Sequence, residues 1–434
     1  MSFKECEVGN IPFEWQCTKL EECIEVLSGY AFKSTDFIDF GVPIIKIKNI
    51  VPPGVSLDDV QYVSKELFNE KSKFKIDYND ILISMTGSNY NQMSSAVGKV
   101  GRVKIKEREM LLNQRVGKII PKENIIDSDF LYYNLSTYET QYRLALSAGG
   151  SANQANINPK HIKNIYIPLP TLPEQKAIAH ILSTLDEKIE VNNQINKTLE
   201  NIAQTIFKQW FVDFEFPNGA GEPYKSSGGE MVESELGMIP KGWEVKNLDD
   251  VADFLNGLAM QKYPPINDKD SFPVLKIKEL RQGFTDDNSD ICSNMIDEKY
   301  VINDGDLIFS WSGSLMVDFW CGEKCGLNQH LFKVTSEKYN KWFYYLWTKH
   351  HLNKFIEIAK SKATTMGHIK RKDLTDSKVI VPANKEFHKI ENIVQPIIEN
   401  MIYKNIENKK LIKLRDSLLP KLMSGEIRVP IEEN

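Results

Sequence analysis

The chain has 434 residues and a formal net charge of −5, with 41% hydrophobic and 26% charged residues. This composition is typical of globular proteins, and no apolar run approaches the roughly 20 residues that a bilayer span needs. The first ten residues, MSFKECEVGN, hold no basic stretch before an apolar core, and six cysteines are too sparse for a disulfide framework. We therefore expect a cytoplasmic protein of two or more domains.

Basic residues gather in two segments of this acidic chain. Residues 95–122 contain eight basic residues against two acidic ones, a net of +6, and residues 359–378 contain six against two, a net of +4. Screening keeps the field of a surface charge local over roughly 8–10 Å, so both segments can attract a polyanion. Such runs are also common on solvated surfaces, and charge alone leaves both interpretations open.

An internal repeat of domain size runs along the chain. Landmarks from residues 11–135 return in the same order between residues 239 and 347, and later ones follow at an offset of 212. The clearest pairs are LSGYA (27–31) with LNGLA (255–259), DILISMTGS (80–88) with DLIFSWSGS (306–314), and LNQRV (112–116) with LNQHL (327–331). Matched landmarks in one order predict two similar domains.

Each copy mixes strand and helix patterns. Runs bounded by Gly, Pro, Asn and Asp, as strands are, include Val42–Ile50, Asp80–Ser84 and Val116–Ile120. Helical patterns cover residues 129–146 and 340–358. We expect an α+β fold in chain order: a strand-rich domain over 1–170, a helical spacer over 171–216, a Gly/Pro/Ser-rich flexible linker over 217–238, a second domain over 239–382, and a second helical spacer with a tail over 383–434.

Heptads of largely apolar residues mark both spacers, which predicts a coiled coil of two long helices. Paired antiparallel, these helices would give the chain an internal pseudo-two-fold axis. The predicted seam comprises Ile178, Ile181, Leu185, Asn192, Ile195, Leu199, Ile202 and Ile206 in the first spacer, and Ile390, Ile393, Ile397, Lys404, Leu411 and Leu414 in the second. Pro396 predicts that the second helix begins or bends there, because proline removes a helical backbone bond. The alternative is that each helix packs only on its own domain.

The spacer length suits a duplex. A helix over residues 178–206 rises about 42 Å, and one turn of B-DNA spans about 34–36 Å. A helical spacer of this length can hold two DNA-reading domains about one turn of the duplex apart. Because the two domains differ in sequence, we expect the two half-sites to differ as well.

Polar loops in both copies offer groups that can bond base edges or phosphates. In the first copy the candidate DNA-binding residues are Thr86, Ser88, Asn89, Asn91, Gln92, Lys99, Arg102, Lys104, Asn113, Gln114, Arg115, Ser151, Asn153, Gln154 and Asn156. In the second they are Ser310, Ser312, Ser314, Asn328, Gln329, His330, Thr364, Thr365, His368, Lys370, Arg371 and Lys372. Because Asn-Gln pairs also brace turns, local structure explains any single residue equally well.

No catalytic motif is found. The chain contains no GxxxxGK[ST] phosphate loop, no paired-carboxylate nuclease cluster, no N/D-P-P-Y/F methyltransferase motif and no HExxH pattern. CGEKC at 321–325 lacks a second ligand pair, so we expect no metal site. Two other readings stay open: a coiled-coil scaffold or interaction protein without DNA, and an enzyme with an unrecognised site.

Several segments resemble the specificity (S) subunits of type I restriction-modification systems. They are IPLPTLPEQ (167–175), FKQWFVDFEF (207–216), SELGMIPKGWEV (234–245) and LRDSLLPKLMSGEIRV (414–429), and the resemblance covers almost the whole chain. VPANKEFHKI in the second copy departs from the fuller LPTLPEQKAI pattern, which puts the start of the second helix in doubt.

The resemblance implies two target-recognition domains that each read one half of a gapped, asymmetric DNA sequence, in a subunit that is not itself an enzyme. It also implies two modification subunits, which hold S-adenosylmethionine and methylate adenine at N6, and two restriction subunits that use ATP and Mg²⁺. This chain would then need no cofactor of its own. Residues that the resemblance suggests at the subunit interface are Trp210, Phe211, Phe214, Leu418 and Leu419.

Overall fold

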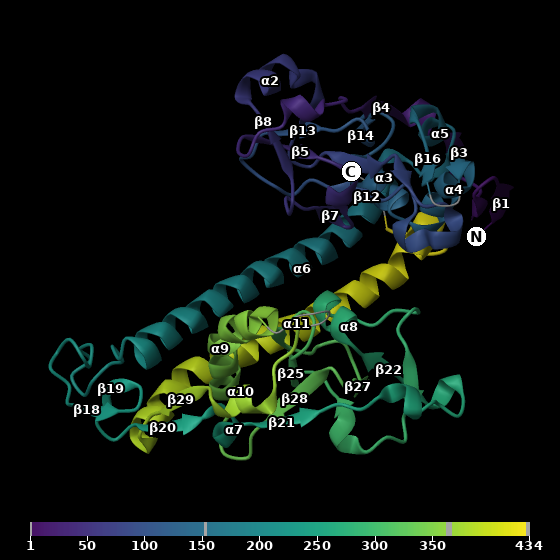
Figure 1. Cartoon of the computed structure of the whole chain (residues 1–434). Helices are drawn as coiled ribbons and strands as arrows, with labels where there is room; N and C mark the ends of the chain where they lie inside the picture. The colour runs from purple at the N-terminus through teal and green to yellow at the C-terminus, as the bar shows by residue number, and fades with distance from the viewer. Residues whose placement is uncertain (1, 152–153, 362–366, 431–434) are drawn as a thin grey trace. The chain divides into compact units, whose positions relative to one another are not determined.

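The computed structural model describes residues 2–151, 154–361 and 367–430. The chain divides into two compact units: unit 1 comprises residues 1–187 and 413–434, and unit 2 comprises residues 188–412. Two long helices, α6 (Leu172–Phe207) and α11 (Asn384–Ser424), each contribute one part to either unit (Figure 1). No helix among the described residues is both long and apolar enough to cross a bilayer.

Unit 1 contains two main sheets. The first has the order β4 (Ile24–Ser28), β14 (Val116–Pro121), β10 (Ile81–Ser84), β12 (Val100–Arg102), β7 (Gly54–Val55) and β6 (Ile50–Val51). The second has the order β8 (Gln61–Val63), β5 (Val42–Ile45), β13 (Met110–Leu112) and β9 (Lys75–Ile76), with β5 and β13 parallel. Smaller sheets are β11 (Thr86–Gly87) with β16 (Gln154–Asn156) and β15 (Gly149–Ser151), β17 (Tyr166–Leu169) with β3 (Gln16–Lys19), and β1 (Phe3–Cys6) with β2 (Gly9–Pro12).

Five shorter helices complete the first copy in unit 1. They are α1 (Leu20–Cys23), α2 (Lys65–Glu70), α3 (Ser128–Leu135), α4 (Tyr138–Ser147) and α5 (Pro159–Lys163). Apolar residues of α3 and α4 pack in one core with Ile178 of α6 and Leu422 of α11. Buried Glu174 joins this core to the C-terminal segment, because it accepts from Trp15 Nε1 at 3.0 Å and from Arg428 Nε at 2.8 Å.

Unit 2 repeats the four strands from β4 to β12 of the first sheet, and all four strands of the second sheet, in the same order. The first has β21 (Asp253–Asn256), β28 (Leu331–Thr335), β25 (Leu307–Ser310) and β26 (Met316–Phe319), and the second has β23 (Ile291–Ser293), β22 (Ser271–Leu275), β27 (Cys325–Leu327) and β24 (Val301–Ile302). β22 and β27 are parallel, as β5 and β13 are in unit 1. The remaining elements are β18 (Met231–Ser234), β19 (Gly237–Pro240), β20 (Glu244–Asn247), β29 (Lys378–Val381), α7 (Leu248–Val251), α8 (Ile277–Gln282), α9 (Lys341–Ser361) and α10 (Arg371–Thr375). The predicted α+β fold with an internal repeat is confirmed.

The segment expected to be a flexible linker, 217–238, is folded in unit 2. β18 pairs antiparallel with β19, just as β1 pairs with β2 at the start of the first copy. Tyr224 stacks on Phe216 with ring centroids 4.5 Å apart, and Asn218 Oδ1 accepts from two backbone N–H groups. Aromatic stacking and turn bonds fix this segment, which its Gly/Pro/Ser content did not reveal.

Within unit 2, α6 and α11 pair through a layer of buried and half-buried amides. Asn192 Nδ2 donates to Asn408 Oδ1 at 2.8 Å, and Asn196 Nδ2 donates to Asn405 Oδ1 at 2.6 Å. As the residue number rises from 192 to 196 along α6, the number of the bonded residue on α11 falls from 408 to 405. The two helices therefore run antiparallel here. In unit 1 the same direction holds, since Asp186 pairs with Arg415 at 2.8 Å and Glu174 with Arg428. The predicted antiparallel helix pair is therefore found inside each unit.

One row of each predicted heptad seam is displaced by one residue. Ile181, Ile202, Ile393 and Leu414 of the predicted seam are at least 36% exposed. The inward residues are their neighbours instead, namely Leu182, Ala203, Val394 and Arg415. The residues of the other row lie inward or half-buried: Ile178, Leu185, Asn192, Leu199 and Ile206 on α6, and Ile390, Ile397, Lys404 and Leu411 on α11. Ile195 is half-buried.

This shift has a physical cause. In a pair of helices that pack only on each other, positions i and i+3 are buried. Each helix here also packs against its own domain, and this second contact widens the buried stripe to include position i+4. Ile390, Val394 and Ile398 belong to the unit 2 core together with the sheet residues. Pro396 does not mark the start of α11, which begins at Asn384; its ring lies on the exposed face.

Candidate nucleic-acid interface

The turn between β13 and β14 of unit 1 holds two polar side chains outward. The Asn113 N–H donates to the Ile45 carbonyl at 3.1 Å, and Asn113 Oδ1 accepts from the Arg115 N–H at 3.4 Å. The Val116 N–H donates to the Asn113 carbonyl at 2.9 Å. Local bonds of this kind are typical of Asx turns. Half-buried Asn113 therefore builds the turn, and Gln114 and Arg115 are its exposed pair.

Three segments of unit 1 meet beside this turn in a surface hollow of about 310 Å³. Antiparallel pairing of β11 with β16 sets Thr86 opposite Asn156, and Thr86 Oγ1 donates to Asn156 Oδ1 at 2.8 Å. The Ile157 N–H donates to the Met85 carbonyl at 3.0 Å. The residues that line the hollow are Ser28, Met85, Thr86, Gln114, Arg115, Asn156, Ile157, Asn158 and Pro159. Four predicted DNA-binding residues, far apart in the sequence, thus share one hollow.

Unit 2 repeats the framework of this turn at equivalent positions. The Asn328 N–H donates to the Leu275 carbonyl at 3.2 Å, and Asn328 Oδ1 accepts from the His330 N–H at 3.2 Å. The Leu331 N–H donates to the Asn328 carbonyl at 3.0 Å. Gln329 and His330 therefore occupy the places that Gln114 and Arg115 hold in unit 1.

The strand ends beside the two turns also correspond. In unit 2 the Ile369 N–H donates to the Trp311 carbonyl at 3.1 Å, which matches the bond from Ile157 to Met85. Ser312 pairs with His368 across an isolated antiparallel bridge, as Thr86 pairs with Asn156. The repeat therefore places Ser312, Gln329, His330 and His368 around one locus of unit 2.

A glycine in each copy permits this arrangement. A Cβ on Gly29 would lie 2.2 Å from the Asn113 carbonyl oxygen, and a Cβ on Gly257 would lie 2.2 Å from the Asn328 carbonyl oxygen. Backbone this close admits only glycine. The repeated LSGYA and LNGLA segments thus support the two polar turns.

The chemistry of the two loci differs although the backbone is the same. Unit 2 has Trp311 where unit 1 has Met85, and its ring centroid lies 6.2 Å from His330 and 6.1 Å from His368. Ser312 Oγ lies 3.1 Å from His330 Nδ1 and fixes the half-buried imidazole. Unit 1 presents an exposed guanidinium at the same place. Unlike side chains on equal frames suit the recognition of unlike sequences.

The remaining polar candidates of unit 1 are not among the residues that line the hollow. Ser88 Oγ lies 2.8 Å from Ser95 Oγ, and Asn89 Oδ1 accepts from the Asn91 N–H at 3.0 Å. These two residues hold the loop, whereas Asn91 and Gln92 are exposed. Of the other candidates, Gln154 is exposed, Lys99 is half-buried, exposed Lys104 donates to Asn79 at 2.9 Å, and Ser151 ends β15. The candidate Asn153 lies outside the described residues.

Arg102 is not available for DNA, contrary to the prediction. It is 5% exposed, its guanidinium pairs with Asp129, and it donates to the Ser128 carbonyl at 2.8 Å. It also stacks over the Tyr132 ring at 4.6 Å. A buried guanidinium with these partners holds α3 against β12, so it acts in folding.

Three residues of the unit 2 set are likewise buried. Ser310, Ser312 and Asn328 are at most 6% exposed, so Ser312 and Asn328 position the locus and Ser310 bonds the Ser312 carbonyl at 3.2 Å. Arg371 donates to the Phe254 carbonyl at 3.1 Å but stays exposed, as do His368, Lys370 and Lys372. Ser314 bonds Arg281. The candidates Thr364 and Thr365 lie outside the described residues.

The aromatic residues expected at a subunit interface are internal. Trp210, Phe211 and Phe214 are 9%, 1% and 8% exposed. Phe211 contacts five aromatic rings of unit 2 with centroids 5.2 to 6.1 Å away, those of Phe207, Trp243, Trp342, Phe343 and Trp347. Their apolar area is therefore used inside unit 2. Leu418 and Leu419 are half-buried against the unit 1 core.

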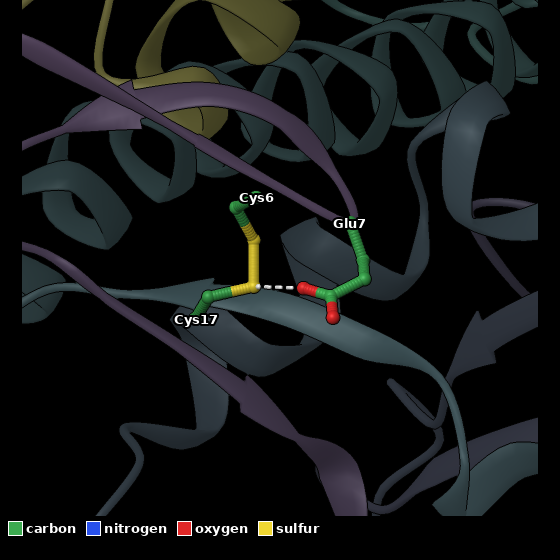
Figure 2. Close-up of side chains that lie close together, drawn as sticks. All are labelled: Cys6, Glu7 and Cys17. Atoms are coloured by element: carbon green, nitrogen blue, oxygen red, sulfur yellow. Dashed lines mark hydrogen bonds between the residues drawn. A yellow bond between two sulfur atoms is a disulfide. The ribbon is translucent and has the colours of Figure 1, made fainter.

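One cysteine pair near the N-terminus forms a disulfide that the sequence did not predict. Cys6 of β1 is bonded to Cys17 of β3, and Glu7 Oε2 lies 3.3 Å from Cys17 Sγ (Figure 2). If this disulfide were reduced, the thiolates of Cys6 and Cys17 and the carboxylate of Glu7 would be ligand types that Zn²⁺ accepts. A structural zinc site has four ligands, and this group offers three. Cys321 and Cys325, the pair noted in the sequence, are buried, and burial raises the pKa of each thiol to about 12.

Sequence reasoning missed Trp311, Ser28 and Asn158 as parts of the two loci. Each is adjacent to a repeated landmark, so the signal was their alignment between copies: Trp311 opposite Met85 in DILISMTGS and DLIFSWSGS. A polar-residue criterion overlooks Trp311 because tryptophan is usually assigned to a core. Its half-buried ring lies beside His330 and His368, which places it in the locus.

Comparison with known proteins agrees with this architecture. The family model described as type I restriction modification DNA specificity domain matches residues 12–201 and 240–414. The type I restriction enzyme MjaIX specificity subunit of Methanocaldococcus jannaschii is 30% identical over 98% of this chain and 96% of its own length. The EcoKI specificity subunit of Escherichia coli K12 is 26% identical over 96% of this chain and 90% of its own length. The crystal structure of an S subunit of a type I restriction-modification system from M. genitalium matches 98% of this chain with a TM-score of 0.55 at 17% identity.

The family model matches twice, once on each copy of the polar turn, and the relatives are matched over nearly their whole length. The chain belongs to the family of type I restriction-modification DNA specificity proteins.

Proposed function

We propose that this chain is the non-catalytic, DNA-reading specificity subunit of a type I restriction-modification enzyme in the cytoplasm. Each unit would read one part of a two-part target, and the two parts would differ in sequence. The observation that supports this is the polar turn built twice on one framework, with Gln114 and Arg115 in one copy and Gln329 and His330 in the other. Nothing in the comparisons favours a scaffold that does not bind DNA.

The partners proposed for this chain are double-stranded DNA, two modification subunits and the restriction subunits. S-adenosylmethionine, ATP and Mg²⁺ would be held by those partners. Burial of Trp210 and Phe211 moves the proposed docking surface to the outward faces of the long helices. In unit 2, large apolar residues that are 42% to 60% exposed on these helices are Val191 and Ile202 on α6 and Ile393 and Tyr403 on α11. Exposed apolar residues on one helix pair can form a protein interface when they are contiguous.

Methylation mapping of host DNA tests the DNA-reading role. A gapped, asymmetric methylated motif should be present with the chain and absent when its gene is deleted. Replacing residues 11–170 by the corresponding domain of a relative should change one half of the motif and leave the other half intact. A motif that survives the deletion contradicts the proposal.

A pull-down with the modification subunit tests the docking surface. Ile202→Asp should weaken capture, because it places a charge on an apolar contact without disturbing the core of unit 2. Asn201→Asp, at the adjacent exposed position of α6, is the matched control and should leave capture unchanged. Equal capture of both variants would show that the helices dock their partner elsewhere.

A further inference from the structure

Positions 115 and 330 are equivalent by their backbone bonds as well as by their sequence. Each follows an asparagine that accepts the residue's own N–H, and each turn is tied to the strand beside it by a bond to Ile45 or Leu275. Their side chains are held in different ways, because Ser312 fixes the His330 imidazole whereas Arg115 is exposed at the rim of the hollow. One structural position thus has two chemistries.

The Arg115 guanidinium has no carboxylate partner among the residues that the structure describes, unlike Arg102 and Arg415 of the same unit. An exposed arginine commonly pairs with a nearby acid, and the basic run around it offers Glu107 and Glu109. Of these, Glu109 pairs with Lys65 instead. Arg115 therefore keeps its fork of N–H donors, which matches the O6 and N7 acceptors of guanine in the major groove.

Resting on the proposed function, we propose that Arg115 is the base-reading residue of unit 1, selecting a guanine, and that His330 sets the preference at the equivalent position of the other half-site. Thr86, Gln114 and Asn156 surround the guanidinium with groups that bond neighbouring base edges or phosphates. His330 has Trp311 beside it, Ser312 Oγ 3.1 Å from Nδ1 and Gln329 Nε2 3.4 Å from Nε2. It therefore offers at most one ring nitrogen, next to the Gln329 amide, instead of a fork of donors. The two half-sites would then differ at the base that Arg115 or His330 contacts, although the backbone of the two turns is the same.

Selection from a randomised duplex library tests this inference. The full-length chain with its modification subunit is mixed with the library at fixed salt, and bound duplexes are sequenced. In Arg115→Gln the preference for guanine at one position of one half-site should fall by about 5- to 150-fold, the range expected for a lost bidentate contact. All other positions should keep their preference. Arg115→His with His330→Arg should exchange preferences between the halves.

Arg108→Gln is the matched control, because it removes an exposed charge of the same basic run away from the hollow. It should weaken binding on all sequences alike and lessen the salt dependence by about one phosphate contact. If Arg115→Gln behaves in the same way, or changes nothing, Arg115 does not read a base and the inference is wrong. If the unaltered chain enriches no motif at all, the proposed DNA-reading function itself fails. Unchanged melting of both variants excludes unfolding as the cause.

Discussion

The amide layer between α6 and α11 in unit 2 can be tested by removing Asn192. This residue is fully buried, and its Nδ2 donates to Asn408 Oδ1 at 2.8 Å and to Glu407 Oε2 at 2.9 Å. A neutral hydrogen bond contributes about 1 kcal/mol, and one to a charged group about 1.5–3 kcal/mol. Lys404 also donates to Glu407 at 2.9 Å, so that carboxylate keeps a partner. Asn192→Ala should therefore lower the free energy of unfolding by about 2–3 kcal/mol.

Urea unfolding followed by tryptophan fluorescence measures this loss. Six of the seven tryptophans lie in unit 2, so the signal reports the unit that contains the layer: Trp210, Trp243, Trp311, Trp320, Trp342 and Trp347. Asn201→Ala on the exposed face of α6 is the control and should change stability by less than about 0.5 kcal/mol. The double variant Asn192→Leu with Asn408→Leu should recover most of the loss, because two apolar partners leave no orphaned amide.

A loss in Asn192→Ala no larger than that of the control would refute the reasoning. It would mean that water replaces the lost bonds and that the layer adds nothing to the stability of the pair. Recovery in the double leucine variant together with aggregation would instead show that the amides maintain the register of the helices.

Three further results are expected. Phe211→Ala should destabilise unit 2 by about 3–5 kcal/mol in the same urea assay, because it empties a site that is 1% exposed, and a variant that lost only partner capture would contradict this. Burial lowers the pKa of His351 to about 4, so the folded state binds a proton there less readily than the unfolded chain does. The free energy of unfolding should therefore fall as the pH drops from about 6.5 to 4, and it should fall by less in His351→Gln. The buried thiols are those of Cys23, Cys292, Cys321 and Cys325, and burial raises their pKa to about 11 or 12. At pH 8 a maleimide should therefore label them slowly until urea is added. Fast labelling under native conditions would show that these thiols are accessible.

Local pattern explains why so much of the architecture could be predicted. Strands and helices follow from periodicity over a few residues, so DILISMTGS and DLIFSWSGS give β10 and β25 in equivalent places. The repeat then predicts two like domains, and the four equivalent strands of each sheet indeed have the same order in the two units. Heptads predicted a helix pair for the same reason.

Side-chain environment could not be predicted in this way. Arg102 and Arg115 belong to one basic run and look alike in sequence, but α3 brings Asp129 to the first and leaves the second at the rim of the hollow. Phe211 looks like an interface residue in the sequence, but Trp342 and Trp347 of α9 contact its ring in the folded chain. Asn328 looks like a base contact, although its amide closes the turn on which His330 sits.

The amino-acid sequence by itself determined that this chain has two related strand-rich domains, two long antiparallel helices and polar loops at matching places, because each depends on neighbours within a few residues or on a comparison of the copies. Only the tertiary structure decided which polar groups stay open to a ligand. That choice depends on partners far away in the sequence, such as Asp129, 27 residues from Arg102, and Asn408, 216 residues from Asn192. It also depends on the domains, which widen the buried stripe of each helix towards position i+4. Burial is a property of the packed chain, and no local pattern contains it.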